Sequence, residues 1–314
     1  MTTLITGATG FIGRRLVATL IAQGHAVRAA VREADPSLPA AQVAVPREST
    51  SIEAWRALVR GCDTVVHLIA RAHILDEHDP DPLPAYRSVN TEMTRACASA
   101  AALEGVRRFV FVSSIGVHGN ASVLQPIQAD DPVAPHSPYA ISKLEAEAAL
   151  RQVASGGPME WTIVRPPLVH GPGAPGNIER MLQVLSRRIP LPLAAVTSNR
   201  RSLVAIDNLV DLLITCLDHP GAANQTFLVS DADDLSTAEL LTRLGRLIDK
   251  PARLFSIPVP MLWAGARLLG KTDAANRLLG SLQVDIAHTV STLGWTPPIS
   301  VDEGLRRTAQ GAIK

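Results

Sequence analysis

The stretch "TGATGFIG", residues 6–13, decides the fold of this chain. It places Gly7, Gly10 and Gly13 directly after a short β-branched stretch and at the start of a stretch with helical spacing. Glycines at such positions allow a tight turn, close approach of the backbone to a pyrophosphate, and close packing of helix on strand. The N-terminus of the helix adds free N–H groups and a partial positive charge. The stretch therefore predicts a dinucleotide-binding loop in a first βαβ unit.

The rest of the first half alternates strand and helix patterns. Short runs rich in Val, Ile and Phe are separated by segments with apolar residues at helical spacing. We expect strands at 2–6, 25–31, 63–70, 107–114 and 161–167, and helices at 11–23, 91–103 and 139–153. Such alternation predicts an α/β fold, a doubly wound parallel sheet with helices on both faces.

The character of the chain changes after Pro166. The loop "RPPLVHGPGAPGN" is followed by a strand and helix at 202–217, a strand at 225–231, and a helix at 236–248 that opens with the capping box Ser236–Glu239. We assign residues 1–166 to a cofactor-binding domain that late elements near 203–231 join. Residues 167–202 and 232–314 form a smaller C-terminal α/β substrate domain.

Composition excludes several classes of partner. The 314 residues carry 30 Lys and Arg against 29 Asp and Glu, so no excess positive charge favours nucleic acid. The cysteines Cys62, Cys97 and Cys216 are far apart, which is typical of reduced buried thiols in a cytoplasmic protein. We expect no metal site. The start of the chain lacks the pattern of a signal peptide.

No apolar run reaches the length of a membrane helix, and we expect no membrane insertion. The nearest approach is "IPVPMLWAGARLLG", residues 257–270, which prolines and an arginine interrupt. We interpret it as a core or subunit-contact helix, with an interfacial patch as the alternative.

The end of the second strand bears on the choice of cofactor. An acid there would bind the ribose 2′-hydroxyl of NAD, but this chain has Val31 followed by Arg32. A guanidinium suits a 2′-phosphate, and Arg14 could add to the same positive charge. These residues favour NADP(H) over NAD(H).

The stretch "SPYAISKLEAE", residues 137–147, holds a candidate reactive pair. Tyr139 and Lys143 lie four residues apart, on one face of an expected helix. A nearby ammonium favours the phenolate and lowers the pKa of a tyrosine, and a serine at the end of the strand 107–114 can bind the same substrate oxygen. Together these groups can move a proton on or off an alcohol while a nicotinamide moves the hydride. We expect Glu145 and Glu147, later on this helix, to be solvated.

The order of these motifs resembles the extended short-chain dehydrogenases/reductases. The resemblance rests on "TGATGFIG", "DTVVHLIA", "SVN", "FVFVSSIGVHG", "SPYAISK" and "VRPPLVHGPG" and spans essentially the whole chain. It implies a Rossmann domain, a sugar-nucleotide substrate and a homodimer. It also implies the catalytic set Ser114, Tyr139 and Lys143, with Tyr139 as general acid/base and Lys143 on the cofactor's ribose.

Further site residues follow from this resemblance. We expect cofactor contacts at Gly7, Thr9, Gly10, Phe11, Ile12, Gly13, Arg32, Leu68, Ala70, Tyr139 and Lys143. Substrate contacts are expected at Ser114, Asn177, Arg201 and Arg277, with Arg201 best suited to hold the diphosphate because a guanidinium pairs bidentately with phosphate. Arg200 and Arg277 are weaker candidates than Arg201.

Departures from the family's patterns narrow the reaction. Dehydratases of the superfamily carry an Asp-Glu pair after the catalytic hydroxyl, and Ile115 and Gly116 stand there instead. Many 4-epimerases carry an asparagine where this chain has Leu168, and tyrosines where it has His118 and His170, which we interpret as structural.

The stretches "HLIARAHILDE", "LPLPLAAVTSNRRSLVAIDNLVD" and "LGWTPPIS" give the chain its likeness to bacterial reductases and epimerases of UDP-N-acetylhexoses. They imply an NADPH-dependent reductase of a UDP-4-keto-6-deoxy-N-acetylhexosamine, used for surface polysaccharide. The alternatives are a UDP-hexose (UDP-GlcNAc/UDP-Glc) 4-epimerase and a catalytically silent NADP-binding regulator.

Overall fold

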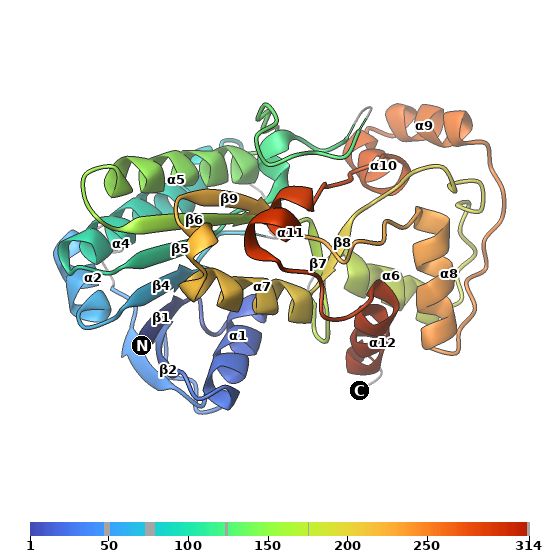
Figure 1. Cartoon of the computed structure of the whole chain (residues 1–314). Helices are drawn as coiled ribbons and strands as arrows, with labels where there is room; N and C mark the ends of the chain where they lie inside the picture. The colour runs from blue at the N-terminus through green and yellow to red at the C-terminus, as the bar shows by residue number, and fades with distance from the viewer. Residues whose placement is uncertain (47–50, 73–78, 123–124, 175, 313–314) are drawn as a thin grey trace.

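A seven-stranded parallel sheet forms the body of the protein (Figure 1). The computed structural model describes all residues except 47–50, 73–78, 123–124, 175 and 313–314, so the end of the "HLIARAHILDE" stretch lies outside the described residues. In spatial order the strands are β3 (Ala41–Ala44), β2 (Ala26–Val31), β1 (Thr2–Thr6), β4 (Thr64–His67), β5 (Arg108–Val112), β6 (Glu160–Arg165) and β9 (Gln225–Leu228). This order confirms the predicted doubly wound fold.

Helices cover both faces of the sheet. On one face α1 (Phe11–Ala22) packs against α7 (Ile206–Asp218), and on the other lie α2 (Ile52–Val59), α4 (Met93–Leu103) and α5 (Pro138–Ala154). Each layer buries its own apolar cluster against the strands, all five residues of β5 being buried. Burial on both faces explains why these strands read as continuous apolar runs rather than alternating ones.

Short elements complete this layer structure. They are α3 (Leu83–Tyr86), a π-helical segment η1 (Arg87–Glu92), and the 3₁₀ turns η2 (Ile115–His118) and η3 (Pro220–Ala222). The expected helix at 91–103 therefore begins in η1 and continues as α4. Within η1 the buried Asn90 accepts a hydrogen bond from Arg71 N at 2.7 Å and donates one to Ser142 Oγ at 2.9 Å. These bonds fasten η1 to the segment after β4 and to α5.

The strand order reverses at the middle of the sheet. From β1 the chain adds β2 and β3 on one side, and β4, β5 and β6 follow on the other. Parallel sheets open a crevice at such a point, outside the carboxyl ends of the strands. The glycine loop after β1 and the residues after β4 meet there.

The second half of the chain builds a smaller unit beside the sheet. It contains β7 (Leu168–His170) paired with β8 (Leu203–Ala205), and the helices α6 (Asn177–Ser186), α8 (Thr237–Leu247), α9 (Val259–Leu268), α10 (Thr272–Leu279) and α12 (Val301–Ala312). The capping box at Ser236 and Glu239 is present at the start of α8. Most of these elements share a third apolar cluster, separate from those of the sheet.

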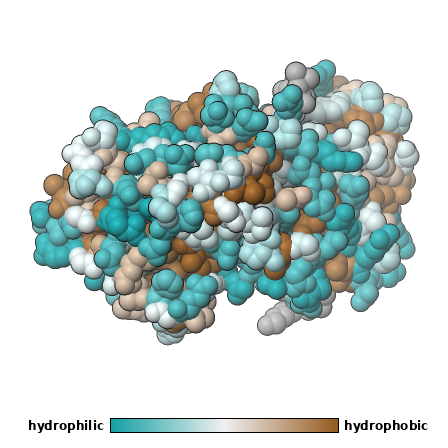
Figure 2. Space-filling model, viewed as in Figure 1, coloured by the Kyte–Doolittle hydropathy of each residue, from teal (hydrophilic) through white to brown (hydrophobic). Residues whose placement is uncertain are grey.

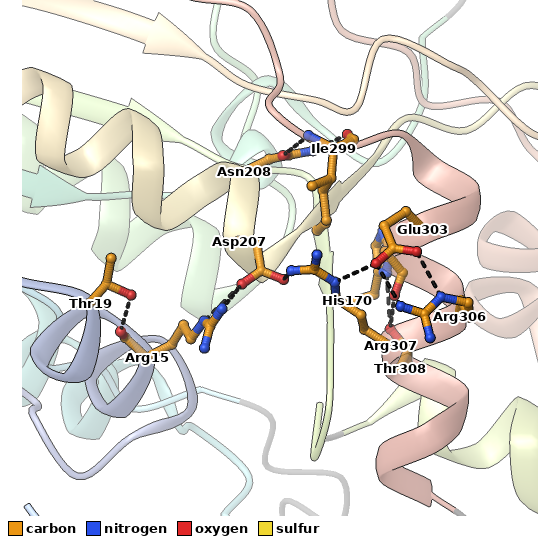
Figure 3. A network of polar contacts seen from close by, with 12 residues as sticks. Arg15, Thr19, His170, Asp207, Asn208, Ile299, Glu303, Arg306, Arg307 and Thr308 are labelled. Atoms are coloured by element: carbon orange, nitrogen blue, oxygen red, sulfur yellow. Dashed lines mark hydrogen bonds and ion pairs between the residues drawn. The ribbon is translucent and has the colours of Figure 1, made fainter. Parts of the chain in front are cut away.

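A chain of charges joins the two units (Figure 3). Asp207, in the first turn of α7, binds Arg15 of α1 and Arg307 of α12, the latter at 3.0 Å. Arg307 also donates to Glu303 at 2.8 Å, as Arg306 does at 2.7 Å. Because the three helices come from distant parts of the sequence, this network fixes α12 against the body that contains the large sheet.

The units interleave differently from the expected boundaries. Within 203–231, α7 and β9 join the large body, but β8 pairs with β7 instead. The segment that holds α11 (Ala287–Leu293) was expected in the smaller unit. It lies against β9, and Trp295 packs into the core beneath α7 while its Nε1 donates to Asp211 at 2.8 Å. Burial of one indole ring thus draws this segment to the sheet.

A buried histidine at the end of β4 makes the fold sensitive to acid. His67 is fully buried beside the rings of Trp55, Phe109 and Phe111, and its Nδ1 lies 2.9 Å from Thr6 Oγ1. Burial, with a smaller contribution from the charge of Lys143, lowers its pKa from 6.5 to about 3. The folded state therefore stays unprotonated at a pH where the unfolded chain binds a proton.

We expect stability to fall as pH drops below 6.5, and His67→Asn to remove part of that fall. Between pH 7.5 and 4.5 the free energy of unfolding should fall by roughly 2–3 kcal/mol more in the wild type than in the variant. Urea unfolding at both pH values measures the difference. The exposed His136 offers the matched control, since His136→Asn should leave the pH dependence as in the wild type. Equal pH dependence in wild type and His67→Asn would contradict the assignment.

Candidate active site

A cavity of about 610 Å³ opens where the carboxyl ends of the strands face the smaller unit. It unites most of the residues expected from the sequence. Those lining it are Gly7, Gly10, Phe11, Ile12, Gly13, Leu68, Ala70, Ser114, Tyr139, Lys143, Asn177, Arg201 and Arg277. The expected catalytic, cofactor and substrate residues thus share one cavity, apart from Thr9 and Arg32.

The glycine loop is packed too closely for side chains. Gly7 has φ +67°, and a Cβ there would lie 3.0 Å from the carbonyl carbon of Leu68. A Cβ on Gly13 would lie 2.2 Å from the oxygen of Gly7. Gly10 begins α1 and no side chain caps that helix end, so its N–H groups remain for a ligand. The loop fits a dinucleotide pyrophosphate.

The N-terminus of α5 positions the reactive pair. Ser137 caps the helix by accepting from Ala140 N at 3.2 Å, and Pro138 occupies the first helical position, both as expected. One turn separates Tyr139 from Lys143 along the helix, and both line the cavity. Ser114 follows β5, lines the same cavity and acts to lower the pKa of Tyr139. Its Oγ accepts from Gly116 N at 3.1 Å, which fixes the hydroxyl.

Burial, rather than the lysine, dominates the pKa of the tyrosine. Burial raises the pKa of Tyr139 to about 12, against a smaller lowering by Ser114. The expectation that Lys143 lowers this pKa is not met in this structure. Lys143 instead donates from Nζ to Val112 O at 2.7 Å, with Nζ 3.9 Å from the ring centre of Phe111.

The lysine itself is a buried cation. Burial lowers the pKa of Lys143 from 10.5 to about 7, and the nearby carboxylate of Glu147 acts in the opposite direction. The ammonium is therefore poised to lose its charge near neutral pH. The charged form is favoured chiefly by the hydrogen bond to the carbonyl of Val112 and by the negative charge of Glu147.

The expectation that Glu147 is solvated is wrong. Its side chain is fully buried one turn after Lys143 and accepts from Arg165 at 2.9 and 2.6 Å and from Arg151 at 3.2 Å. Burial alone raises the pKa of this carboxyl, but the bonds and charge of Arg165 outweigh burial and leave it lowered. Glu145 stays partly exposed and pairs with Arg87, as a surface residue would. The helix turns one glutamate inward and the other outward.

Two arginines face the far end of the cavity. Arg201 lies mostly buried beneath α10 and donates to Gly280 O at 3.1 Å, while Arg277 comes from α10 itself. Within the part of the chain that the structure describes, neither forms an ion pair with a carboxylate. Burial and the charge of Arg277 lower the pKa of Arg201. Two unpaired guanidinium groups beside a cavity suit an anion such as a diphosphate.

Three expected contributors lie outside the cavity lining. Thr9 and Arg32 are exposed, and Arg200 donates to the carbonyls of Thr197 and Asn199 at 2.8 and 3.0 Å. Arg32, directly after β2, points into solvent.

An acidic residue near the end of β2 was not predicted from the sequence to be part of the cofactor site. Asp35, four residues past the strand, binds Arg14. Arg14 also donates to Thr9 O at 2.9 Å and to Ser37 Oγ at 2.7 Å. Bonds from Ser37, together with Arg14, lower the pKa of Asp35. The charge of Arg14 is thus already paired beside the glycine loop.

Comparison with known proteins identifies the family. The family model described as "NAD dependent epimerase/dehydratase family" matches residues 3–230. The chain belongs to this family. A UDP-glucose 4-epimerase from Vibrio cholerae is 43% identical over 99% of this chain and 95% of its own length. An N-acetyl-alpha-D-glucosaminyl-diphospho-ditrans,octacis-undecaprenol 4-epimerase from Escherichia coli O157:H7 is 28% identical, over 98% and 94%.

Solved structures share the fold across its whole length. A UDP-N-acetylglucosamine 4-epimerase from Bacillus cereus superposes with a TM-score of 0.80 at 16% identity, covering 99% of this chain and 96% of its own. A short-chain dehydrogenase/reductase superfamily protein from Agrobacterium tumefaciens with bound NAD gives 0.78 at 24%, covering 99% and 97%. These structures share the overall fold of this chain.

Several lining residues of this family member were not expected from the sequence. They are Ala72, Val112, Ser113, Ile115, Gly116, Pro166, Pro167, Leu168, Val169, Met181, Leu203, Leu235, Ser236, Thr237 and Leu240. Most are apolar and come from segments that fold together only in three dimensions. The capping box at the start of α8 marked a helix end, but no pattern placed that end on the cavity.

Both histidines interpreted as structural are tied into the protein. His118 Nε2 lies 2.8 Å from Arg165, which can only donate, so this nitrogen accepts. His170 is buried between Asp231 and Thr308, at 2.9 and 3.2 Å, and does not line the cavity. Neither replaces a catalytic tyrosine.

We expect Glu147→Gln to destabilise the protein and to alter Lys143. The change leaves Arg165 buried without a counter-charge, which costs about 3–5 kcal/mol of unfolding free energy. It also removes the carboxylate that raises the pKa of Lys143, so the alkaline limb of the pH–rate profile should move to lower pH. Urea unfolding and a pH profile measure the two effects.

The matched control for this change is Glu145→Gln. Its partly exposed pair with Arg87 should contribute less than about 1 kcal/mol. Its pH profile should match the wild type. If both variants behaved alike, the buried pair would have no special role.

Proposed function

We propose that the protein is an NAD-dependent 4-epimerase of a UDP-hexose. The observation that carries the proposal is the 43% identity, over 99% of the chain, to a UDP-glucose 4-epimerase. The cavity supports it, because a proton-transfer group lies at one end and two unpaired arginines lie at the other. This replaces the reductase as the leading interpretation.

The residues of the cavity divide the work. Arg201 and Arg277 hold the diphosphate, with Asn177 beside them, and so direct the sugar toward α5. Ser114 binds the hydroxyl at carbon 4, and Tyr139 takes its proton and later returns it. A bound nicotinamide supplies the hydride chemistry at carbon 4. Inversion at carbon 4 would require the cavity to let the oxidised sugar present its other face before the hydride is returned.

Lys143 serves this cycle as a charge. Its ammonium would hold the cofactor's ribose, while burial keeps the pKa of Tyr139 raised to about 12. The carboxylate of Glu147 opposes the loss of a proton from that ammonium, a loss that burial brings close to neutral pH.

The reaction is tested by an assay without a reductant. The protein is mixed with NAD and with UDP-glucose or UDP-GlcNAc, and ¹H NMR follows the 4-epimers. We expect interconversion with no net change in reduced cofactor. Stoichiometric oxidation of NADPH by a UDP-4-keto-6-deoxy-N-acetylhexosamine, without interconversion, would establish the reductase instead.

Tyr139→Phe should lower turnover by about 10²–10⁴ while leaving NAD affinity within twofold. The chain offers one other tyrosine as a matched control. Tyr86 is buried with its ring centroid 6.4 Å from that of Tyr139 and does not line the cavity. Tyr86→Phe keeps its ring and should retain most activity. Equal losses in both variants would remove Tyr139 from the proton-transfer role.

We further infer that Asp35 favours NAD over NADP. It pairs with the arginine that could have held a 2′-phosphate, and its own charge would repel that phosphate. Asp35→Asn should tighten NADP binding roughly tenfold, which corresponds to about 1.4 kcal/mol. Glu33→Gln, an exposed acid in the same segment, should leave both affinities unchanged. Calorimetric titration with each cofactor measures them, and unaltered NADP affinity in Asp35→Asn would refute the inference.

A further inference from the structure

The outward face of α9 is apolar, although it faces solvent. None of the residues of this helix is buried. Its inner side, with Val259 and Leu262, packs partly against the third cluster. The opposite side carries Met261, Ala264, Gly265 and Leu268 at spacings of three, four and seven residues, and all four are exposed. A surface helix normally turns such a stripe to the core.

Exposed apolar side chains gather here rather than scatter. Leu268 is 88% exposed, Leu269 71%, Met261 63% and Phe255 47%. These four, called the α9 patch below, are four of the nine large exposed hydrophobic residues in the described part of the chain. In Figure 2 apolar surface shows at the end of the molecule where Figure 1 has α9. A gathered patch, unlike single exposed residues, indicates an interaction surface.

The charged side chains of the segment that carries the α9 patch are all cations, and Asp249 and Asp273 lie just outside this segment. Residues 250–271 include Lys250, Arg253, Arg267 and Lys271 and no carboxylate, in a chain whose formal net charge is only +1. Arg253, Arg267 and Lys271 are exposed, and none of the four forms an ion pair within the described residues. An apolar face bordered by unpaired cations is complementary to a surface that is both anionic and apolar.

We propose that the α9 patch docks the protein on the surface of an anionic lipid bilayer. Met261, Leu268 and Leu269 would enter the boundary between headgroups and acyl chains, and the cations would meet lipid phosphates. Among the described residues no helix combines the length and apolar character needed to cross a bilayer, so the contact is peripheral. For residues 257–270 the proposal therefore favours the interfacial patch, which was the alternative predicted from the sequence.

A second copy of the chain fits this surface less well. A two-fold interface brings the same patch of both copies together. The four cations of residues 250–271 would then face four others without a carboxylate between them. A bilayer with anionic headgroups supplies the missing negative charge.

The docking surface adjoins the cavity. The helix α9 packs against α10, and α10 carries Arg277, which lines the cavity. Docking would therefore hold the diphosphate end of the site one helix away from the bilayer. The docking inference does not depend on which reaction the cavity performs.

Vesicle sedimentation tests the proposal with the full chain. Vesicles of phosphatidylcholine with 30% phosphatidylglycerol are compared with vesicles of phosphatidylcholine alone. We expect binding to the anionic vesicles at least tenfold tighter than to the neutral ones, and weakened by added salt. The double variant Met261→Ser/Leu268→Ser and the triple variant Arg253→Gln/Arg267→Gln/Lys271→Gln should each bind at least tenfold more weakly.

Leu103→Ser is the matched control, since Leu103 is 65% exposed on α4, in the other unit. It should bind vesicles as the wild type does. Circular dichroism and a melting curve establish that each variant is folded. Absent vesicle binding, or equal binding by wild type and Met261→Ser/Leu268→Ser, overturns the proposal. A third result also overturns it: the wild type does not bind vesicles, and sedimentation equilibrium shows that the double variant has a different number of protomers from the wild type. That result would assign the patch to contact between copies of the chain.

Discussion

The buried pair between Glu147 and Arg165 ties together the elements that carry the proposed catalytic groups. Glu147 lies on α5 one turn after Lys143, and Arg165 ends β6. The same guanidinium also donates to Ala129 O at 2.9 Å and contacts His118 in the turn after Ser114. One ion pair therefore joins the helix, the sheet and the serine turn. Both partners are almost fully buried, so each depends on the other for its charge.

Most of the fold could be predicted from the sequence, because the features that determine it are local sequence patterns. Glycines at positions where a Cβ would clash with the backbone give a recognisable glycine spacing, and strands buried on both faces give continuous apolar runs. What the sequence could not place depends on contacts between distant segments. Trp295 enters the core of the larger body through packing under α7, and nothing near it in the sequence differs from an ordinary loop. The pairing of β8 with β7 is likewise a tertiary choice.

The site shows the same division more sharply. A spacing of four residues predicted that Tyr139 and Lys143 share a cavity, and they do. It could not predict their pKa values, because these depend on burial by residues from other elements. Nor could it separate Glu145 from Glu147, two positions apart on one helix, of which only the second meets Arg165. Charges are read correctly from a sequence only when their partners are local.

The sequence alone did not decide between epimerase and reductase, because the contacts that bear on the choice join residues distant in the sequence. Both reactions need the same proton transfer at carbon 4, so Ser114, Tyr139 and Lys143 serve either equally. They differ in whether the cofactor stays bound or is exchanged, and the residues beside the adenosine ribose bear on this only through the choice between NAD and NADP. There the exposed Arg32 suggested a phosphate, while the pairing of Arg14 with Asp35 argues for a hydroxyl. A positive charge that is already neutralised contributes little to an anion site. The contact between two residues 21 positions apart thus weighs more than the identity of either.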